Sequence, residues 1–128
     1  FDPSGSPDVL GSLLERLLSD VPGRSHRDAV YASAQVRITD EGLLAALLDG
    51  DVTAEFDWLR RQPYMESGLG GIFPHDLARD LLDKDLRWRN PQRQRLLHER
   101  AGRHYLRLME VGDTEVQQSA LFDLTPAD

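Results

Sequence analysis

The feature that most constrains the fold is a ten-residue break in an otherwise helical pattern, at residues 64–73. On both sides of this break, apolar residues recur three and four positions apart, which predicts amphipathic helices. Within the break, apolar pairs flank a glycine-rich centre from Gly68 to Gly71, a pattern typical of a short antiparallel hairpin. The chain is therefore expected to be mainly α, with one short β-hairpin.

Residues that start and stop helices divide the segment before the hairpin into four helices. The first is a linking helix within residues 1–24, which begins at Ser6-Pro7 and stops at Pro22-Gly23. Three short helices should follow, at 26–36, 40–49 and 53–62. Their expected capping residues are Ser25, Thr39 and Thr53, in that order. Three short helices and then a hairpin is the order of a winged helix-turn-helix. The other arrangement that this pattern allows is an irregular helical bundle with a glycine loop.

Two further helices are expected after the hairpin. The first starts at His75, and the second is a long basic helix that starts at Asn90-Pro91 and ends at Gly112. Thr114 is a candidate cap for one more short helix. The resulting division is a linking helix at 1–24, a winged-helix-like core at 25–86, the basic helix at 87–112, and a tail or following helical region at 113–128. The missing initiator methionine indicates a fragment of a longer protein.

The charge pattern limits the classes of partner. The net charge is −7, which argues against non-specific binding to nucleic acid. Residues 87–107 nevertheless hold seven arginines and one acid, whereas residues 1–58 hold eleven acids and four bases. This asymmetry favours pairing between the basic helix and the acidic N-terminal half, or a solvated basic face. With no cysteine, no signal peptide and no apolar run of membrane-spanning length, a cytoplasmic location without membrane contact is expected.

The sequence contains no recognisable catalytic set, so the chain is not expected to be an enzyme. Its four histidines form no i,i+4 pair, which leaves no metal site to predict. There is no Gly-x-Ser-x-Gly elbow and no Gly-x-x-x-x-Gly-Lys-Ser/Thr loop. The chain alone is therefore expected to bind no metal, nucleotide or other cofactor.

A winged helix raises the alternative of direct DNA binding. The recognition helix would be 53–62, with Arg60, Arg61 and Gln62 as candidate readers of bases or phosphates. Acidic residues on and before that helix, and a wing without any base, would repel DNA phosphates. A further alternative is a protein-interaction module whose basic helix docks an acidic partner.

The segment Pro74-His75-Asp76 is the strongest functional candidate. A histidine at a helix start can point its imidazole, together with backbone N–H groups, at an anion. It can equally form a local hydrogen bond, with Asp76 favoured at that place by the helix dipole. Composition and spacing leave both interpretations open.

Residues 74–81, Pro-His-Asp-Leu-Ala-Arg-Asp-Leu, resemble the Met-His-Asp motif of the NB-ARC-type signalling ATPases, also called STAND ATPases. In that family the motif follows the hairpin of a winged-helix domain. The surrounding segment, with Leu-Arg-Trp-Arg-Asn-Pro at 86–91, is most similar to the bacterial transcription regulators of the family. Pro74 stands where the family usually has Met, so the packing ahead of the histidine differs.

The resemblance implies a non-catalytic regulatory module that packs on the adjacent nucleotide-binding domain of the same chain. His75 would contact the β-phosphate of ADP held by that domain, and Asp76 would support the local geometry. Exchange of ADP for ATP would release the module and allow the parent protein to oligomerise. The nucleotide would be bound by the P-loop of the parent protein and not by this chain.

Overall fold

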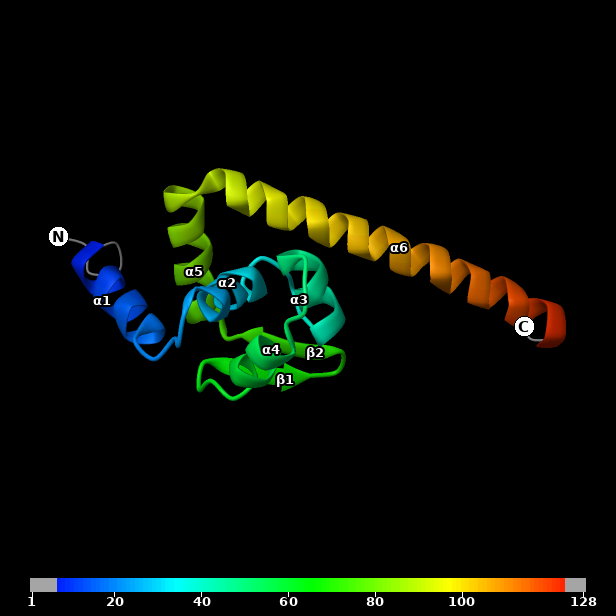
Figure 1. The fold of residues 1–128 in the computed structure, drawn as a ribbon, viewed down its shortest axis with the longest axis horizontal. Helices are drawn as coiled ribbons and strands as arrows, with labels where there is room; N and C mark the ends of the chain where they lie inside the picture. The colour runs from blue at the N-terminus through cyan, green and yellow to red at the C-terminus, as the bar shows by residue number, and fades with distance from the viewer. Residues whose placement is uncertain (1–6, 124–128) are drawn as a thin grey trace.

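The order of elements along the chain is four helices, a two-stranded hairpin and two more helices (Figure 1). The computed structural model describes the backbone of residues 7–123 and the side chains of residues 11–110. The elements are α1 Pro7–Leu18, α2 Arg24–Ser33, α3 Glu41–Leu48, α4 Thr53–Leu59, β1 Met65–Gly68, β2 Gly71–Pro74, α5 Asp76–Arg89 and α6 Pro91–Asp123.

Helices α2 to α4 and the hairpin form a winged-helix-like core. The strands pair antiparallel, with Met65 opposite Pro74 and Gly68 opposite Gly71. A third segment joins them, because the amide and carbonyl of Thr39 both bond to Ile72, each at 2.8 Å. This bridge ties the link between α2 and α3 to the wing. The expected fold class, mainly α with a short hairpin and flanking helices, is confirmed.

Gly71 is the residue that lets the wing approach the helices. Its φ of +147° lies in a region that side chains strongly disfavour. A Cβ at this position would lie 2.1 Å from the carbonyl oxygen of Thr39. Glycine is therefore required by both the backbone conformation and the close contact.

The three expected capping residues in the first half of the chain are wrong. Gly23 caps α2 without a side-chain bond, because its extended backbone after Pro22 lets the helix start ahead of Ser25. Thr39 uses its backbone in the bridge, and Asp40 caps α3 by accepting from the Leu43 amide at 2.8 Å. Thr53 is itself the first residue of α4, where Oδ1 of Asp51 accepts from its amide at 3.0 Å and from its hydroxyl at 2.8 Å. Ser6 lies outside the described residues.

Several expected helix ends also differ, and α2 ends at Ser33 where residue 36 was expected. Helix α4 stops at Leu59, so Arg60 to Gln62 lie in the turn that leads to the hairpin, where the Met65 amide bonds to the Gln62 carbonyl at 3.0 Å. Helix α6 continues past Gly112 to Asp123, so neither an end at Gly112 nor a cap at Thr114 is present. One glycine costs a helix only about 1 kcal/mol, which is too little to end a long one.

Helix α6 lies across the winged core and then projects away from it (Figure 1). Its start is set by Asn90, whose side chain accepts from the Arg93 amide at 3.0 Å. Two of its arginines are tied to the N-terminal half. Arg93 pairs with Asp28 at 3.1 Å, and Arg100 donates to the Leu47 carbonyl at 2.8 Å.

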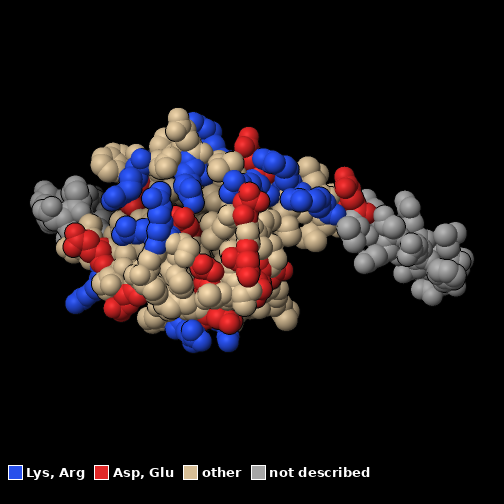
Figure 2. Space-filling view, viewed as in Figure 1, with Lys and Arg blue, Asp and Glu red and all other residues tan. Residues whose placement is uncertain are grey.

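The remaining charges are mostly paired along a single helix or left at the surface. Ion pairs at i,i+4 spacing join side chains within α5 and within α6, and one at i,i+3 joins Asp57 of α4 to Arg60 just after the helix. Figure 2 shows a concentration of basic side chains over α5 and the start of α6, with acidic groups beside it. Within the described part of the chain, no helix is both long and apolar enough to cross a bilayer.

Gly71→Ala tests the contact between the wing and Thr39. We expect the free energy of unfolding to fall by about 3 kcal/mol, because the new methyl group displaces a backbone carbonyl and strains φ. Gly102→Ala in α6 is the matched control, since a methyl group added there would meet no atom within 4 Å. That variant should gain about 0.5–1 kcal/mol from helix propensity. Urea denaturation measures both, and equal stability of Gly71→Ala and wild type would contradict the argument.

Candidate functional site

His75 lies between the wing and α5, at the point where the strand becomes a helix. Its amide donates to the Tyr64 carbonyl at 2.9 Å, which extends the pairing of the hairpin by one residue. Its side chain is the N-cap of α5, with Nδ1 accepting from the Ala78 amide at a long 3.4 Å. The local hydrogen bond that the sequence left open is therefore present.

This cap leaves one ring atom available. Nδ1 accepts a hydrogen bond only without a proton, so the neutral ring carries its proton on Nε2. No hydrogen bond to Nε2 is present within the described residues. His75 can therefore cap its helix and still donate one hydrogen bond to a group outside the chain.

The half-buried His75 ring lines a pocket of about 330 Å³ between α1 and the core. Most of the wall is apolar, and the polar residues besides His75 come from α1, from the turn after it and from the segment that leads into the hairpin. The apolar wall includes Leu13, Leu17, Leu77 and Leu81, and the polar side chains are Arg16, Asp20, Gln62 and Tyr64. Arg16 is a cation that sequence reasoning missed, because it lies almost 60 positions from His75 and no local pattern links them.

Asp76 directly follows His75, but it does not line the same pocket. It is the exposed first residue of α5, where its carboxylate complements the helix dipole. It lines a second depression together with Arg79 and Asp80, and not the pocket of His75. The supporting role expected of Asp76 stays a prediction.

Arg79, within the same motif, has a clear structural role. Its guanidinium donates to the carbonyl oxygens of Val36 and Arg37, with 2.9 Å to Arg37. These bonds hold the first turns of α5 against the link that carries Thr39. Arg79 and the Thr39–Ile72 bridge therefore place His75 relative to the helices.

The three candidate DNA readers do not form one binding face. Arg60 pairs with Asp57 at 3.3 Å, and Gln62 donates to the Trp58 carbonyl at 2.8 Å while lining the His75 pocket. Arg61 is exposed and has no ion-pair partner within the described residues. Only one unpaired cation thus remains in the segment expected to read DNA.

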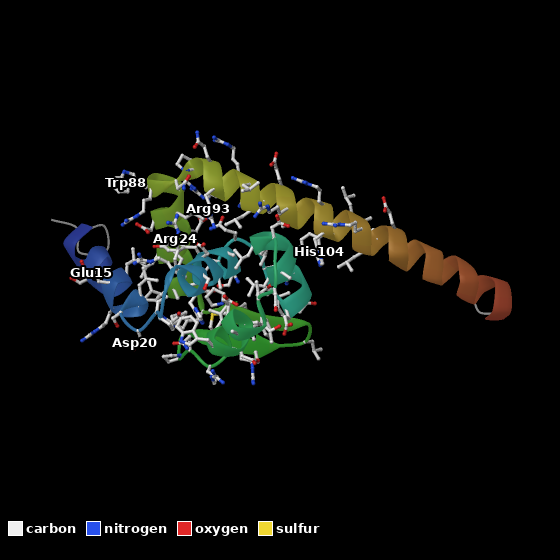
Figure 3. The ribbon with its side chains drawn as sticks, in the orientation of Figure 1. Glu15, Asp20, Arg24, Trp88, Arg93 and His104 are labelled. Atoms are coloured by element: carbon white, nitrogen blue, oxygen red, sulfur yellow. The ribbon has the colours of Figure 1, made fainter. Side chains whose placement is uncertain are left out.

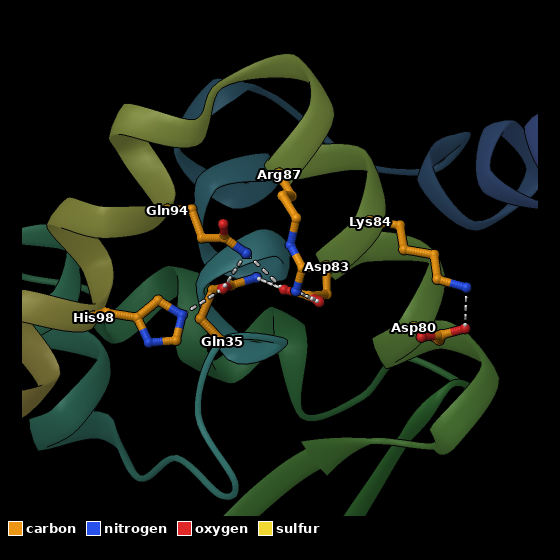
Figure 4. Close-up of polar contacts among 7 residues, drawn as sticks. All are labelled: Gln35, Asp80, Asp83, Lys84, Arg87, Gln94 and His98. Carbon is orange, nitrogen blue, oxygen red and sulfur yellow. Dashed lines mark hydrogen bonds and ion pairs between the residues drawn. The ribbon is translucent and has the colours of Figure 1, made fainter.

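Sequence reasoning also missed a polar network where α2, α5 and α6 meet (Figure 4). Asp83 accepts from Gln35 at 3.1 Å, Gln94 at 2.8 Å and Arg87 at 2.9 Å. The side-chain oxygen Oε1 of Gln35 also lies 2.9 Å from Nε2 of His98. Only the i,i+4 pair of Asp83 and Arg87 was readable from spacing. Because its polar groups are satisfied by one another, the network serves to join the helices.

Comparisons with known proteins add no assignment. No protein-family model, curated protein or solved structure matches the chain. Among the described residues, no group of three or more His, Asp or Glu side chains could hold a metal ion.

Tyr64→Phe tests the polarity of the pocket wall. The Tyr64 hydroxyl is buried without a hydrogen-bond partner in the described structure, so its removal should raise the free energy of unfolding by about 1 kcal/mol at pH 7. Burial raises the pKa of Tyr64 to about 12. Unfolded tyrosine ionises near pH 10, so the folded state binds the proton more tightly and wild type loses stability as the pH rises from 10 to 12.

The advantage of the phenylalanine variant should therefore grow over that interval. Urea midpoints at pH 7 and pH 11 measure it. A variant less stable than wild type at both pH values would show that the hydroxyl has a stabilising partner.

Proposed function

We propose that this chain is the non-catalytic regulatory winged-helix module of a cytoplasmic, bacterial STAND-type ATPase that regulates transcription. In this proposal the module packs on the adjacent nucleotide-binding domain of the same chain and reads its ADP or ATP state through His75. Release of the module on nucleotide exchange would permit oligomerisation of the parent protein. ADP and ATP belong to the parent protein, and this chain supplies the contact.

The single observation that carries the proposal is the hydrogen bonding of the His75 side chain. It sits directly after the wing, caps a 14-residue helix through Nδ1 and keeps Nε2 free to donate. A hydrogen bond from Nε2 to a phosphate oxygen would exist only while the module is docked. Such a contact differs between two nucleotide states, which is what a switch requires.

The pocket beside His75 is consistent with a docking role. Its leucines offer an apolar surface for a neighbouring domain, while Arg16 adds a positive charge on the same wall. The exposed Asp20 on this wall opposes that charge, so the pocket alone is not a strong anion site. The phosphate would instead be held by the nucleotide-binding domain, with His75 contributing one contact.

His75→Ala and His75→Ser in the parent protein test the proposal. Ala removes both the cap and the imidazole, whereas Ser restores a capping oxygen without Nε2. We expect both variants to bind ADP roughly 10- to 100-fold more weakly, because a hydrogen bond to a charged group contributes about 1.5–3 kcal/mol. Both should also raise basal signalling. Chromatography of co-purified nucleotide and a reporter assay measure these effects.

The serine variant separates a ligand contact from a structural role. If only His75→Ala loses ADP, the residue acts as a helix cap. Unchanged ADP content and unchanged signalling in both variants would refute the nucleotide-sensing role.

Direct DNA binding has less support than docking, since Arg60 is paired and Gln62 faces the His75 pocket. In fluorescence anisotropy with labelled DNA at low salt, we expect no duplex binding by the wild type or by Arg61→Ala. Salt-dependent binding that Arg61→Ala weakens would instead favour the DNA-binding alternative.

The protein-interaction alternative needs a test that spares the fold. Arg93 and Arg100 are tied to Asp28 and to the Leu47 carbonyl, so reversing their charge would disturb the packing of α6. Arg95 and Arg107 are exposed and have no ion-pair partner within the described residues, which makes them the suitable sites for charge reversal.

A further inference from the structure

A pocket of about 570 Å³ lies on a different face from His75, where the α1–α2 link meets the corner between α5 and α6. Its wall holds four arginines, which we call the arginine pocket: Arg24 and Arg27 of α2, Arg89 of α5 and Arg93 of α6. Arg24 and Arg93 are labelled in Figure 3, on the side of the molecule where basic groups gather in Figure 2. Three separate segments thus bring guanidinium groups to one concave site.

Two of these arginines are held in place by carboxylates of the same wall. Arg93 pairs with Asp28 at 3.1 Å, and Arg89 pairs with Asp85 at 3.4 Å. The Tyr31 hydroxyl donates to the other oxygen of Asp85 at 2.5 Å. These contacts orient Arg89 and Arg93 but leave most of their N–H donors unused.

The other two arginines are unpaired. Arg24 and Arg27 are exposed, and neither forms an ion pair or a side-chain hydrogen bond within the described residues. Four guanidinium groups against two carboxylates, Asp28 and Asp85, leave the wall with an excess of two positive charges. In a chain of net charge −7, such an excess in one cavity is a local exception.

The backbone adds to the positive electrostatic potential of the arginine pocket. Helix α2 starts at this wall with Gly23 at its N-cap, no side-chain cap and no acidic residue in its first turn. Neither a side-chain cap nor a first-turn acid from the described residues therefore neutralises its first amide groups and the positive end of its dipole. This contribution is secondary to that of the arginines.

We propose that the arginine pocket binds a small phosphate-bearing ligand. Arg24 and Arg27 supply free guanidinium forks, and Arg89 and Arg93 complete the site from positions set by Asp85 and Asp28. A phosphate group of charge near −2 matches the excess charge of the wall, and its oxygens accept paired bonds from planar guanidinium groups. The cavity falls in the size range of small-molecule sites and has room for the group that carries the phosphate.

Titration calorimetry of the purified protein with inorganic phosphate and pyrophosphate, at constant ionic strength against chloride, tests this site. We expect saturable binding of both, with pyrophosphate bound more tightly because it can engage more of the arginines. Arg24→Ala/Arg27→Ala should weaken binding at least about tenfold. Because neither residue forms an ion pair, the circular dichroism and urea midpoint of this double variant should match wild type.

Two control variants make the result specific. Arg107→Ala removes an exposed arginine of α6 that lies outside the pocket and should bind like wild type. Arg24→Lys/Arg27→Lys keeps the charge without the planar fork and should give an intermediate affinity. The arginine pocket shares no lining residue with the pocket of His75, so the arginine pocket and the proposed nucleotide contact can fail independently.

Either of two kinds of result would overturn the proposal. One is the absence of saturable binding of either phosphate compound, or binding that Arg24→Ala/Arg27→Ala leaves unchanged. The other is binding of single- or double-stranded DNA that is tighter than that of pyrophosphate and is lost in the same double variant. That result would indicate that the arginines bind the phosphate backbone of a nucleic acid.

Discussion

The bridge between Thr39 and Ile72 is the interaction on which the rest of the structure depends. It joins the link after α2 to the second strand of the wing, with both backbone bonds at 2.8 Å. Gly71 permits this approach because any Cβ would overlap the Thr39 carbonyl. The wing is thereby held against the helices, and α5 starts from a fixed point at its end.

In the segment that resembles the Met-His-Asp motif, some side-chain atoms form hydrogen bonds within the fold, and at least one has no partner among the described residues. Arg79 is used by the fold, since its guanidinium holds α5 against the carbonyls of Val36 and Arg37. His75 uses Nδ1 as a cap and keeps Nε2. A segment of this kind can therefore be needed for folding and still present one hydrogen-bond donor to another molecule or domain. A variant that keeps the cap but removes the donor separates these two roles.

The arginines of this acidic chain serve two different purposes. Arg93 pairs with Asp28 of the N-terminal half, as the opposite charges of the two regions indicated, and Arg100 donates to the backbone carbonyl of Leu47. Arg24 and Arg27, in contrast, have no carboxylate partner among the described residues and lie on the wall of a pocket. The distinction could not be read from the charge count, since it depends on which acid lies within reach of each guanidinium group.

Local features of the sequence determined the helical spacing, the glycine-rich hairpin, the helix start at Asn90-Pro91 and the position of His75 at the start of α5. Each is encoded within a few residues by periodicity, turn chemistry or capping. Only the tertiary structure decided that Gln35 meets Asp83 and that arginines from three segments share one pocket. The two side-chain contacts join positions far apart in the chain, where packing geometry, and not local preference, sets which groups meet.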